Sequence, residues 1–197
     1  MKRILTILLA LPLLFAGCKE EDTVLSQRDN IEKFLTSTRR LVAYEDISSV
    51  IENNPQFYET FGRYAYRYIV NYYDEGREDL PLVEWGNTLQ LRFNAYVFNG
   101  SEPSRSSALY WSNIPSVITS VEAVEGDPLV WSSDPLTVQL GTTKVIEGLN
   151  LTLPGCRERD SVQVFMTSDL AYGKTILGSV PKNSMVAWYM KIEKVTK

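Results

Sequence analysis

The sequence contains no histidine among its 197 residues, and only two cysteines, Cys18 and Cys156. Without histidine, catalytic triads and metal sites that need an imidazole are excluded. Two cysteines cannot form a disulfide framework, and no carboxylates follow the spacing of a calcium-binding loop. A metal site built from carboxylates alone remains possible, but the sequence shows no pattern for one.

The chain also lacks an excess of positive charge. It has 20 Lys and Arg against 24 Asp and Glu, which gives a formal net charge of −4. Because phosphate binding needs clustered basic residues, we expect no nucleic-acid partner. The hydrophobic fraction of 44% is sufficient for the core of one domain of ordinary size.

No apolar run reaches the roughly 20 residues that a membrane span needs, but a shorter run follows the N-terminus. Basic Lys2 and Arg3 precede the apolar residues 4–15, and Ala-Gly-Cys18 comes next. This order predicts a secretory signal over residues 1–17. An ordinary cleaved signal followed by an accidental cysteine remains the alternative.

A cysteine directly after Ala-Gly resembles the signal of bacterial lipoproteins. The resemblance implies that Cys18 is acylated and holds the protein in the lipid bilayer. The expected location is the bacterial cell envelope, on the periplasmic or outward side of a membrane, most naturally the outer membrane.

Residues 18–61 are expected to form a lipidated tether with short helices. Residues 19–28 are polar and show no apolar period. The apolar spacing within residues 28–41 predicts an amphipathic helix. Residues 46–52 predict a second helix that ends before Asn54-Pro55.

Residues 62–197 show the periodicity of strands and are expected to form one domain with an insertion around 101–134. Alternating apolar residues predict strands at 64–72, 88–98, 136–140, 161–166 and 186–195. A short helix is expected over 147–153. These elements predict an α+β fold in which an antiparallel sheet of about five strands wraps over one short helix.

Three blocks of the last third, Val145–Leu149, Ser168–Gly173 and the strand Met185–Val195, resemble FKBP-type peptidyl-prolyl cis-trans isomerases in order and spacing. The resemblance extends over residues 66–194. It implies an apolar cup that receives a prolyl ring, and proline-containing segments of exported proteins as partners. It requires neither a metal nor a cofactor.

The resemblance also implies roles for individual residues. Tyr172 would bond a substrate carbonyl, Val145 and Ile146 would form the upper wall, and Trp188 would replace the aromatic residue of the last strand. The other implied pocket residues are Phe93, Tyr110, Trp111, Leu136, Leu149 and Val180. Cys156 is expected to be a small buried apolar group.

The pocket departs from the family pattern in the motif Phe-Asp-Ser-Ser, which supplies an aromatic residue and a buried acid. Either Tyr110-Trp-Ser-Asn113 or Val130-Trp-Ser-Ser133 can match it, so Trp111 or Trp131 replaces the acid. The family's floor tryptophan is Leu149, and its second-strand tyrosine is Phe93. The resemblance thus implies an isomerase of reduced activity; the alternatives are a non-catalytic peptide-binding module and a structural surface lipoprotein.

Overall fold

The structure is a computed structural model that describes residues 11–197 except 63, 105–107, 121–126 and 143–144. Residues 1–10 of the expected signal and the side chain of Cys18 lie outside the described part. In chain order the elements are α1 (Leu11–Thr36), β1 (Arg40–Ala43), the 3-10 helix η1 (Tyr44–Ser49), β2 (Phe57–Phe61), β3 (Ala65–Ile69), η2 (Arg77–Asp79), β4 (Thr88–Val97), β5 (Leu109–Ser112), α2 (Pro115–Ile118), β6 (Leu136–Gln139), α3 (Glu147–Thr152), β7 (Ser161–Met166), η3 (Ser168–Leu170) and β8 (Val186–Thr196).

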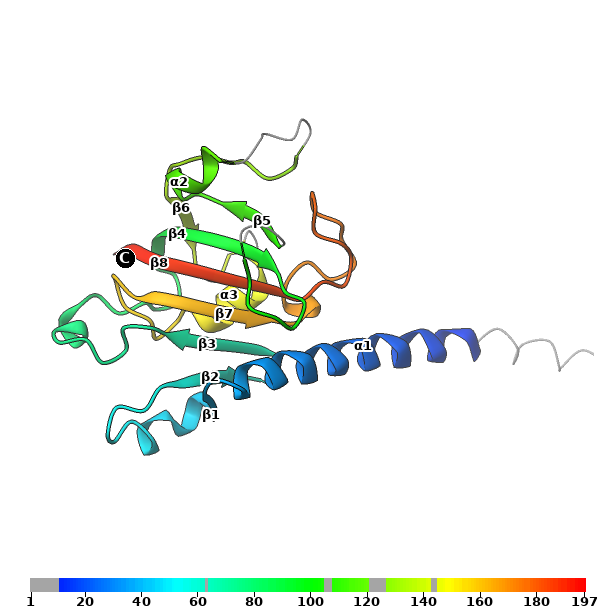
Figure 1. Ribbon diagram of the computed structural model, residues 1–197, viewed down its shortest axis with the longest axis horizontal. Coiled ribbons are helices and arrows are strands. Elements are labelled where there is room, and N and C mark those ends of the chain that lie inside the picture. Colours follow the sequence, from blue (N-terminus) through cyan, green and yellow to red (C-terminus); the bar gives the residue numbers. More distant parts are fainter. Residues whose placement is uncertain (1–10, 63, 105–107, 121–126, 143–144) are drawn as a thin grey trace, which may run out of the picture.

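The strands form one sheet in the order β1-β2-β3-β7-β8-β4-β5, with β6 also paired to β4. All pairings are antiparallel except the parallel pairing of β1 with β2. Helix α3 lies on one face of the sheet and α1 on the other (Figure 1). The expected α+β class, the five strands and the short helix are confirmed.

Three further strands correct the expectation of about five. β1 and β2 come from residues expected to form the tether and its helices, and β5 lies within the expected insertion. The helix expected over 46–52 is the 3-10 helix η1 instead. Helix α1 includes residues 19–28, expected to be irregular. The reason is local: these residues include Glu, Lys, Leu, Gln and Arg, which favour helix, and no Gly or Pro to interrupt it.

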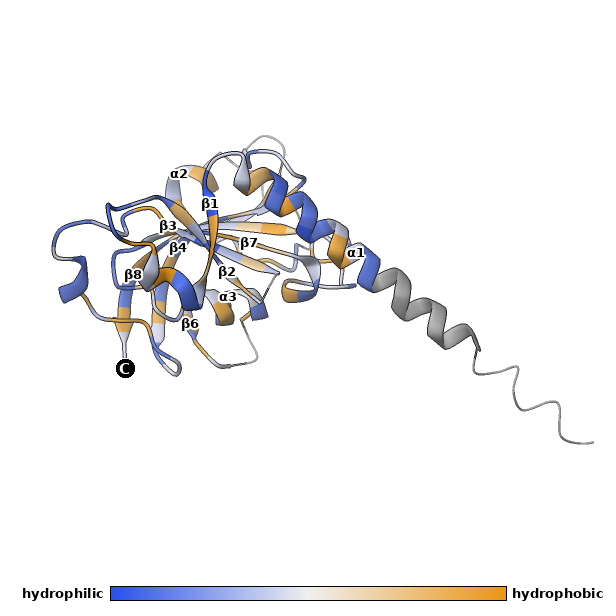
Figure 2. Ribbon diagram, turned by 90° about the horizontal axis from the view of Figure 1, so that it is seen from below, coloured by the Kyte–Doolittle hydropathy of each residue, from blue (hydrophilic) through white to orange (hydrophobic). Residues whose placement is uncertain are grey.

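Helix α1 packs on the sheet through its last turns, and its earlier turns extend beyond the sheet (Figures 1 and 2). Ile31 and Leu35 are fully buried against the tyrosines and Phe165 of the sheet. No helix within the described residues is long and apolar enough to cross a membrane.

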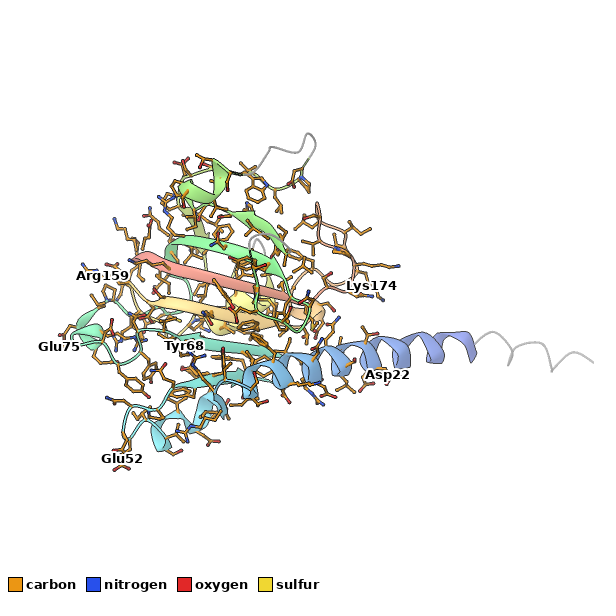
Figure 3. All side chains as sticks on the ribbon, in the orientation of Figure 1. Asp22, Glu52, Tyr68, Glu75, Arg159 and Lys174 are labelled. Carbon is orange, nitrogen blue, oxygen red and sulfur yellow. The ribbon has the colours of Figure 1, made fainter. Side chains whose placement is uncertain are left out.

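Because α1 covers one face and α3 the other, β3 is buried on both faces. Tyr66 and Tyr68 face α1, whereas Ala65 and Ile69 belong to the core under α3. The hydroxyl of Tyr66 donates to Glu32 on α1 at 2.8 Å. Figure 3 shows Tyr68 near this helix.

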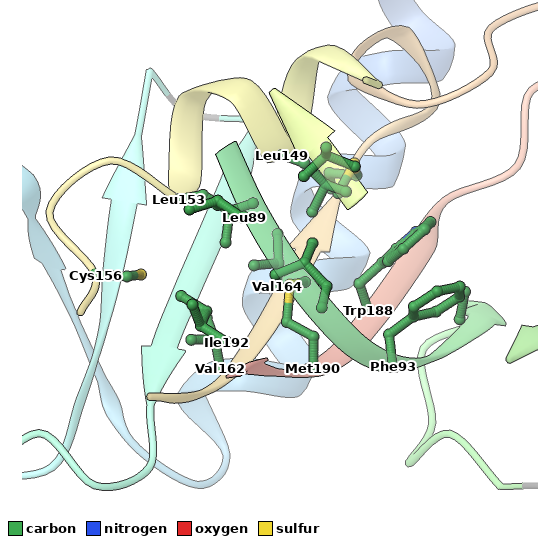
Figure 4. Close-up of a cluster of buried hydrophobic side chains, with 14 of the residues drawn as sticks. Leu89, Phe93, Leu149, Leu153, Cys156, Val162, Val164, Trp188, Met190 and Ile192 are labelled. Carbon is green, nitrogen blue, oxygen red and sulfur yellow. The ribbon is translucent and has the colours of Figure 1, made fainter. Parts of the chain in front are cut away.

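The main core lies between the sheet and α3 (Figure 4). Leu149 and Leu153 project from α3 onto strand residues such as Leu89 and Val164. Gly148 permits this close approach, since a Cβ at that position would lie 2.4 Å from the sulfur of Met166.

A buried ion pair fixes the end of α3. Arg67 on β3 is 1% exposed and pairs with Glu59 on the neighbouring strand β2. Its guanidinium also donates to the carbonyls of Thr152 and Pro154, where α3 ends. A cation there satisfies carbonyls that have no partner within the helix, so this pair holds α3 in place beneath the cavity described next.

Candidate functional site

A cavity of about 690 Å³ opens on the α3 side of the sheet. Its walls come from β5, β6, β8, the N-terminal end of α3 and the loop that follows η3. The lining residues are Thr88, Trp111, Leu129, Leu136, Thr137, Val138, Gln139, Thr142, Val145, Ile146, Leu149, Tyr172, Leu177 and Trp188. The lining is therefore mostly apolar and aromatic.

Seven of the residues that the resemblance implied lie on these walls; they are Trp111, Leu136, Val145, Ile146, Leu149, Tyr172 and Trp188. The other three, Phe93, Tyr110 and Val180, do not line the cavity but are buried in the core behind it. All ten thus come together in one region, although the strands and loops that carry them are far apart in sequence.

Two aromatic rings, those of Trp111 and Trp188, line one end of the cavity, and Phe93 packs behind them. Phe93 stacks on Trp188, with ring centroids 4.6 Å apart and planes 26° apart, as Figure 4 shows. The ring of Trp111 meets Phe93 edge-on at 4.7 Å and Trp188 at 5.7 Å. Such edge-to-face contacts add stability beyond burial, so these rings form a firm wall.

The contact between Phe93 and Trp111 explains two departures from the family pattern together. The resemblance assigns a tyrosine to the position of Phe93 and an acid to the position of Trp111. A tyrosine and an acid can form a hydrogen bond with each other. In this chain both are apolar and their rings touch. Replacing both partners of a polar pair leaves no buried polar group unsatisfied.

The structure also separates the two possible matches to the acid position. Trp111 lines the cavity, and its indole N–H donates to the carbonyl of Val130 at 2.9 Å. Trp131 is not among the lining residues, and its indole donates to Asp127 at 3.0 Å. Of the two tryptophans, Trp111 is therefore the one that shapes the site.

A short polar chain runs behind the apolar wall. The indole N–H of Trp188 donates to the hydroxyl of Tyr110 at 2.9 Å, and that hydroxyl lies 3.1 Å from the hydroxyl of Tyr172. Burial raises the pKa of both tyrosines above their usual value. Both hydroxyls are therefore neutral at physiological pH and available as hydrogen-bond donors.

Sequence reasoning missed other parts of the site. Leu129 and Leu177 line the cavity from irregular segments that show no periodicity. A second recess of about 550 Å³ shares Thr142, Val145 and Ile146 with the first and is bordered by the 58% exposed Trp85. The two hollows thus adjoin at these three shared residues.

The chemistry available in the cavity is that of shape, apolarity and neutral donors. Within the described ranges, no group of three or more Cys, Asp or Glu side chains is placed to hold a metal ion. Cys156 is fully buried, and burial raises the pKa of its thiol to about 12. The thiol is therefore protonated and away from solvent, as a packing group.

Comparison with known proteins agrees with this geometry. Residues 121–193 match a family described as FKBP-type peptidyl-prolyl cis-trans isomerase. That range begins after β5, so it contains Trp131 but not Trp111. No curated protein sequence matches the chain.

Among solved structures, the fold is similar to the N-terminal domain of FKBP42 from Arabidopsis thaliana, with a TM-score of 0.51. The match has 16% sequence identity and covers 71% of this chain and 92% of that one. Residues 121–193 thus resemble the FKBP-type peptidyl-prolyl cis-trans isomerase family, and the sheet and its helix have an FKBP-like fold.

Proposed function

We propose that this protein is a peptidyl-prolyl cis-trans isomerase of reduced activity that assists the folding of exported proteins. The observation that carries the proposal is the apolar cavity of about 690 Å³ in which Val145, Ile146 and Leu149 face Trp188 and Tyr172. A cavity with these walls accepts a prolyl ring and keeps water away from it.

The reaction is a rotation and breaks no covalent bond. The planar X–Pro amide is stabilised by resonance, and the uncatalysed barrier is about 18–20 kcal/mol. Twisting the bond reduces the charge separation of the amide, so an apolar cavity favours the twisted state over the polar planar state. Tyr172 assists by donating its hydroxyl to a carbonyl next to the proline.

Reduced activity follows from Trp111. An acid at that position offers a fixed charge near the bound amide, whereas the indole offers only apolar surface and bonds Val130 on the other side. Because the rotation needs no proton transfer, the exchange weakens the positioning of the substrate without removing a chemical step.

The full-length chain in detergent micelles, assayed with a chromogenic tetrapeptide that has one Ala–Pro bond, tests the proposal. We expect cis-to-trans relaxation faster than the thermal rate. Trp188→Ala should abolish most of the acceleration by opening the cavity to water, at a stability loss of about 3–5 kcal/mol. Trp131→Ala is the matched control, because its indole does not line the cavity.

A binding module without turnover is the second candidate. It is favoured by Trp111 in place of the acid and by the second recess, which extends the binding surface past Val145 and Ile146. In that case the tetrapeptide quenches tryptophan fluorescence but relaxes at the thermal rate. A protein that neither binds nor accelerates is a structural lipoprotein, and the isomerase proposal is then wrong.

We further propose that acylated Cys18 anchors the protein to a bacterial envelope membrane. The support is the sequence Ala-Gly-Cys18 after an apolar run. In the structure, the N-terminal turns of α1 extend away from the sheet (Figures 1 and 3).

A further inference from the structure

The hydroxyl of Tyr110 has no counterpart in the family motif, which has phenylalanine at this position in the match to Tyr110-Trp-Ser-Asn113. Tyr110 is 2% exposed and lies behind the cavity wall. Its oxygen is nevertheless the middle member of the polar chain from Trp188 to Tyr172. A buried hydroxyl in an apolar core is unfavourable unless it is hydrogen-bonded, so the Tyr110 hydroxyl depends on its partners Trp188 and Tyr172.

The direction of the chain follows from counting donors. An indole N–H can only donate, so the Tyr110 oxygen accepts from Trp188. The Tyr110 hydroxyl hydrogen then needs an acceptor, and among the described residues the oxygen of Tyr172 is its one remaining hydrogen-bond partner. The reverse arrangement would bury the Tyr110 hydrogen without an acceptor, which is costly.

Tyr110 therefore donates to Tyr172, and the part of the chain that the structure describes holds no acceptor for the hydrogen of the Tyr172 hydroxyl. Tyr172 lines the cavity, so this hydrogen serves an acceptor held there.

We propose that Tyr110 is a positioning residue that sets the Tyr172 hydroxyl as a donor to the carbonyl next to the bound proline. Trp188 then serves twice, as an apolar wall and as the first donor of the chain. Each donor polarises the next one, so Tyr172 is a stronger donor than an isolated tyrosine. This inference rests on the proposed function, because it needs a carbonyl in the cavity.

A double-mutant cycle in the full-length chain tests it, with the Ala–Pro tetrapeptide as the probe. Tyr172→Phe should lower kcat/KM by about two- to tenfold, the effect of one net hydrogen bond. Tyr110→Phe should also lower kcat/KM in the otherwise wild-type chain. It should have no further effect on kcat/KM in a protein that already carries Tyr172→Phe. A role in packing alone would give the same factor in both backgrounds.

Two further variants make the test independent of stability. Trp188→Phe keeps a ring against Phe93 but removes the first donor, and it should lower kcat/KM less in the Tyr110→Phe background than in the wild type. Tyr68→Phe is the control, because its hydroxyl bonds Gln56 on the opposite side of the sheet. It should leave kcat/KM unchanged.

The outcomes separate the two proposals. Turnover with additive effects of Tyr110→Phe and Tyr172→Phe overturns the role of Tyr110 and leaves the isomerase intact. If the wild type binds the tetrapeptide without turnover, the isomerase fails and the same cycle in Kd, followed by tryptophan fluorescence, decides the role of Tyr110. If the wild type neither binds nor turns over, both proposals fail.

Discussion

At the scale of single residues, the site differs from the family pattern in its polar groups. Phe93 and Trp111, which the resemblance places where the family has a tyrosine and an acid, touch through their rings. A new hydrogen-bonded chain runs from Trp188 through Tyr110 to Tyr172. Phe93 and Trp111 thus meet through apolar rings, whereas hydrogen bonds connect Trp188, Tyr110 and Tyr172.

This pairing predicts how the family's acid can be restored. Trp111→Asp alone should lower stability and should not raise kcat/KM, because the carboxylate would face the ring of Phe93 without a donor. Combined with Phe93→Tyr, the same aspartate gains a hydroxyl partner, and both stability and kcat/KM should recover. Melting curves and the tetrapeptide assay check both, and a single variant that equals the double variant would refute the pairing.

Cys156 gives a prediction for alkaline pH. Burial raises the pKa of its thiol in the folded protein from 9.0 to about 12. A raised folded-state pKa stabilises the protein fully below the unfolded value and loses this effect as pH rises toward the folded value. The free energy of unfolding should therefore fall between about pH 9 and 12.

The matched control for this prediction is Cys156→Ala, measured by urea unfolding at the same pH values. Tyrosines also titrate in this range and affect both proteins equally. The variant should lose stability less steeply than the wild type above pH 9. Equal slopes would show that the thiol is not held protonated by burial.

At the scale of elements, α1 connects the expected tether to the site. Gln27 donates to the carbonyl of Asn183 at 2.7 Å and accepts from the N–H of Ser168 at 2.9 Å. Ser168 opens η3, which leads directly to Tyr172, and Asn183 belongs to the loop between η3 and β8. One side chain of α1 thus holds two loops that border the cavity.

Gln27→Ala should release both contacts. We expect a loss of about 1–3 kcal/mol for two net hydrogen bonds and faster amide hydrogen exchange at Ser168. Lys33→Ala is the control, since Lys33 is exposed on the same helix. If amide exchange around Ser168 is unchanged in Gln27→Ala, α1 does not hold these loops.

The elements that could be predicted from sequence are those with a clear period and a single partner surface. β4 and β8 are long, and β4 alternates over most of its length, so their strand character was evident. β2 has no such pattern, because Glu59 lies in its middle and is buried only by pairing with Arg67. β1 has four residues, too few for periodicity to show.

The site shows the same limit. The resemblance located Val145, Ile146 and Tyr172 because they lie in blocks with the family's spacing. Leu177 and Trp85 come from segments without such a pattern, and only the folded chain places them beside those blocks. The hydrogen bond from Trp188 to Tyr110 joins residues 78 positions apart, and no local sequence pattern predicts it.

At the scale of the whole molecule, the proposed lipid anchor can be tested separately from the activity of the domain. If Cys18 is acylated, the protein from the membrane fraction should carry a lipid-modified N-terminal cysteine by mass spectrometry. Cys18→Ser should prevent the modification and release the processed protein from that fraction. A Cys18→Ser protein that is processed and membrane-bound like the wild type would refute the anchor, whatever the activity of the domain.

The central claim is that the cavity accelerates rotation about an X–Pro bond. Exchange NMR of the Ala–Pro tetrapeptide tests it most directly, because it reports cis–trans exchange at equilibrium without a coupling protease. With the wild-type chain we predict exchange far faster than uncatalysed isomerisation, which takes about 10–100 s. In Trp188→Ala the exchange rate should return toward the thermal rate. Exchange at the thermal rate with stoichiometric wild-type protein would contradict the account.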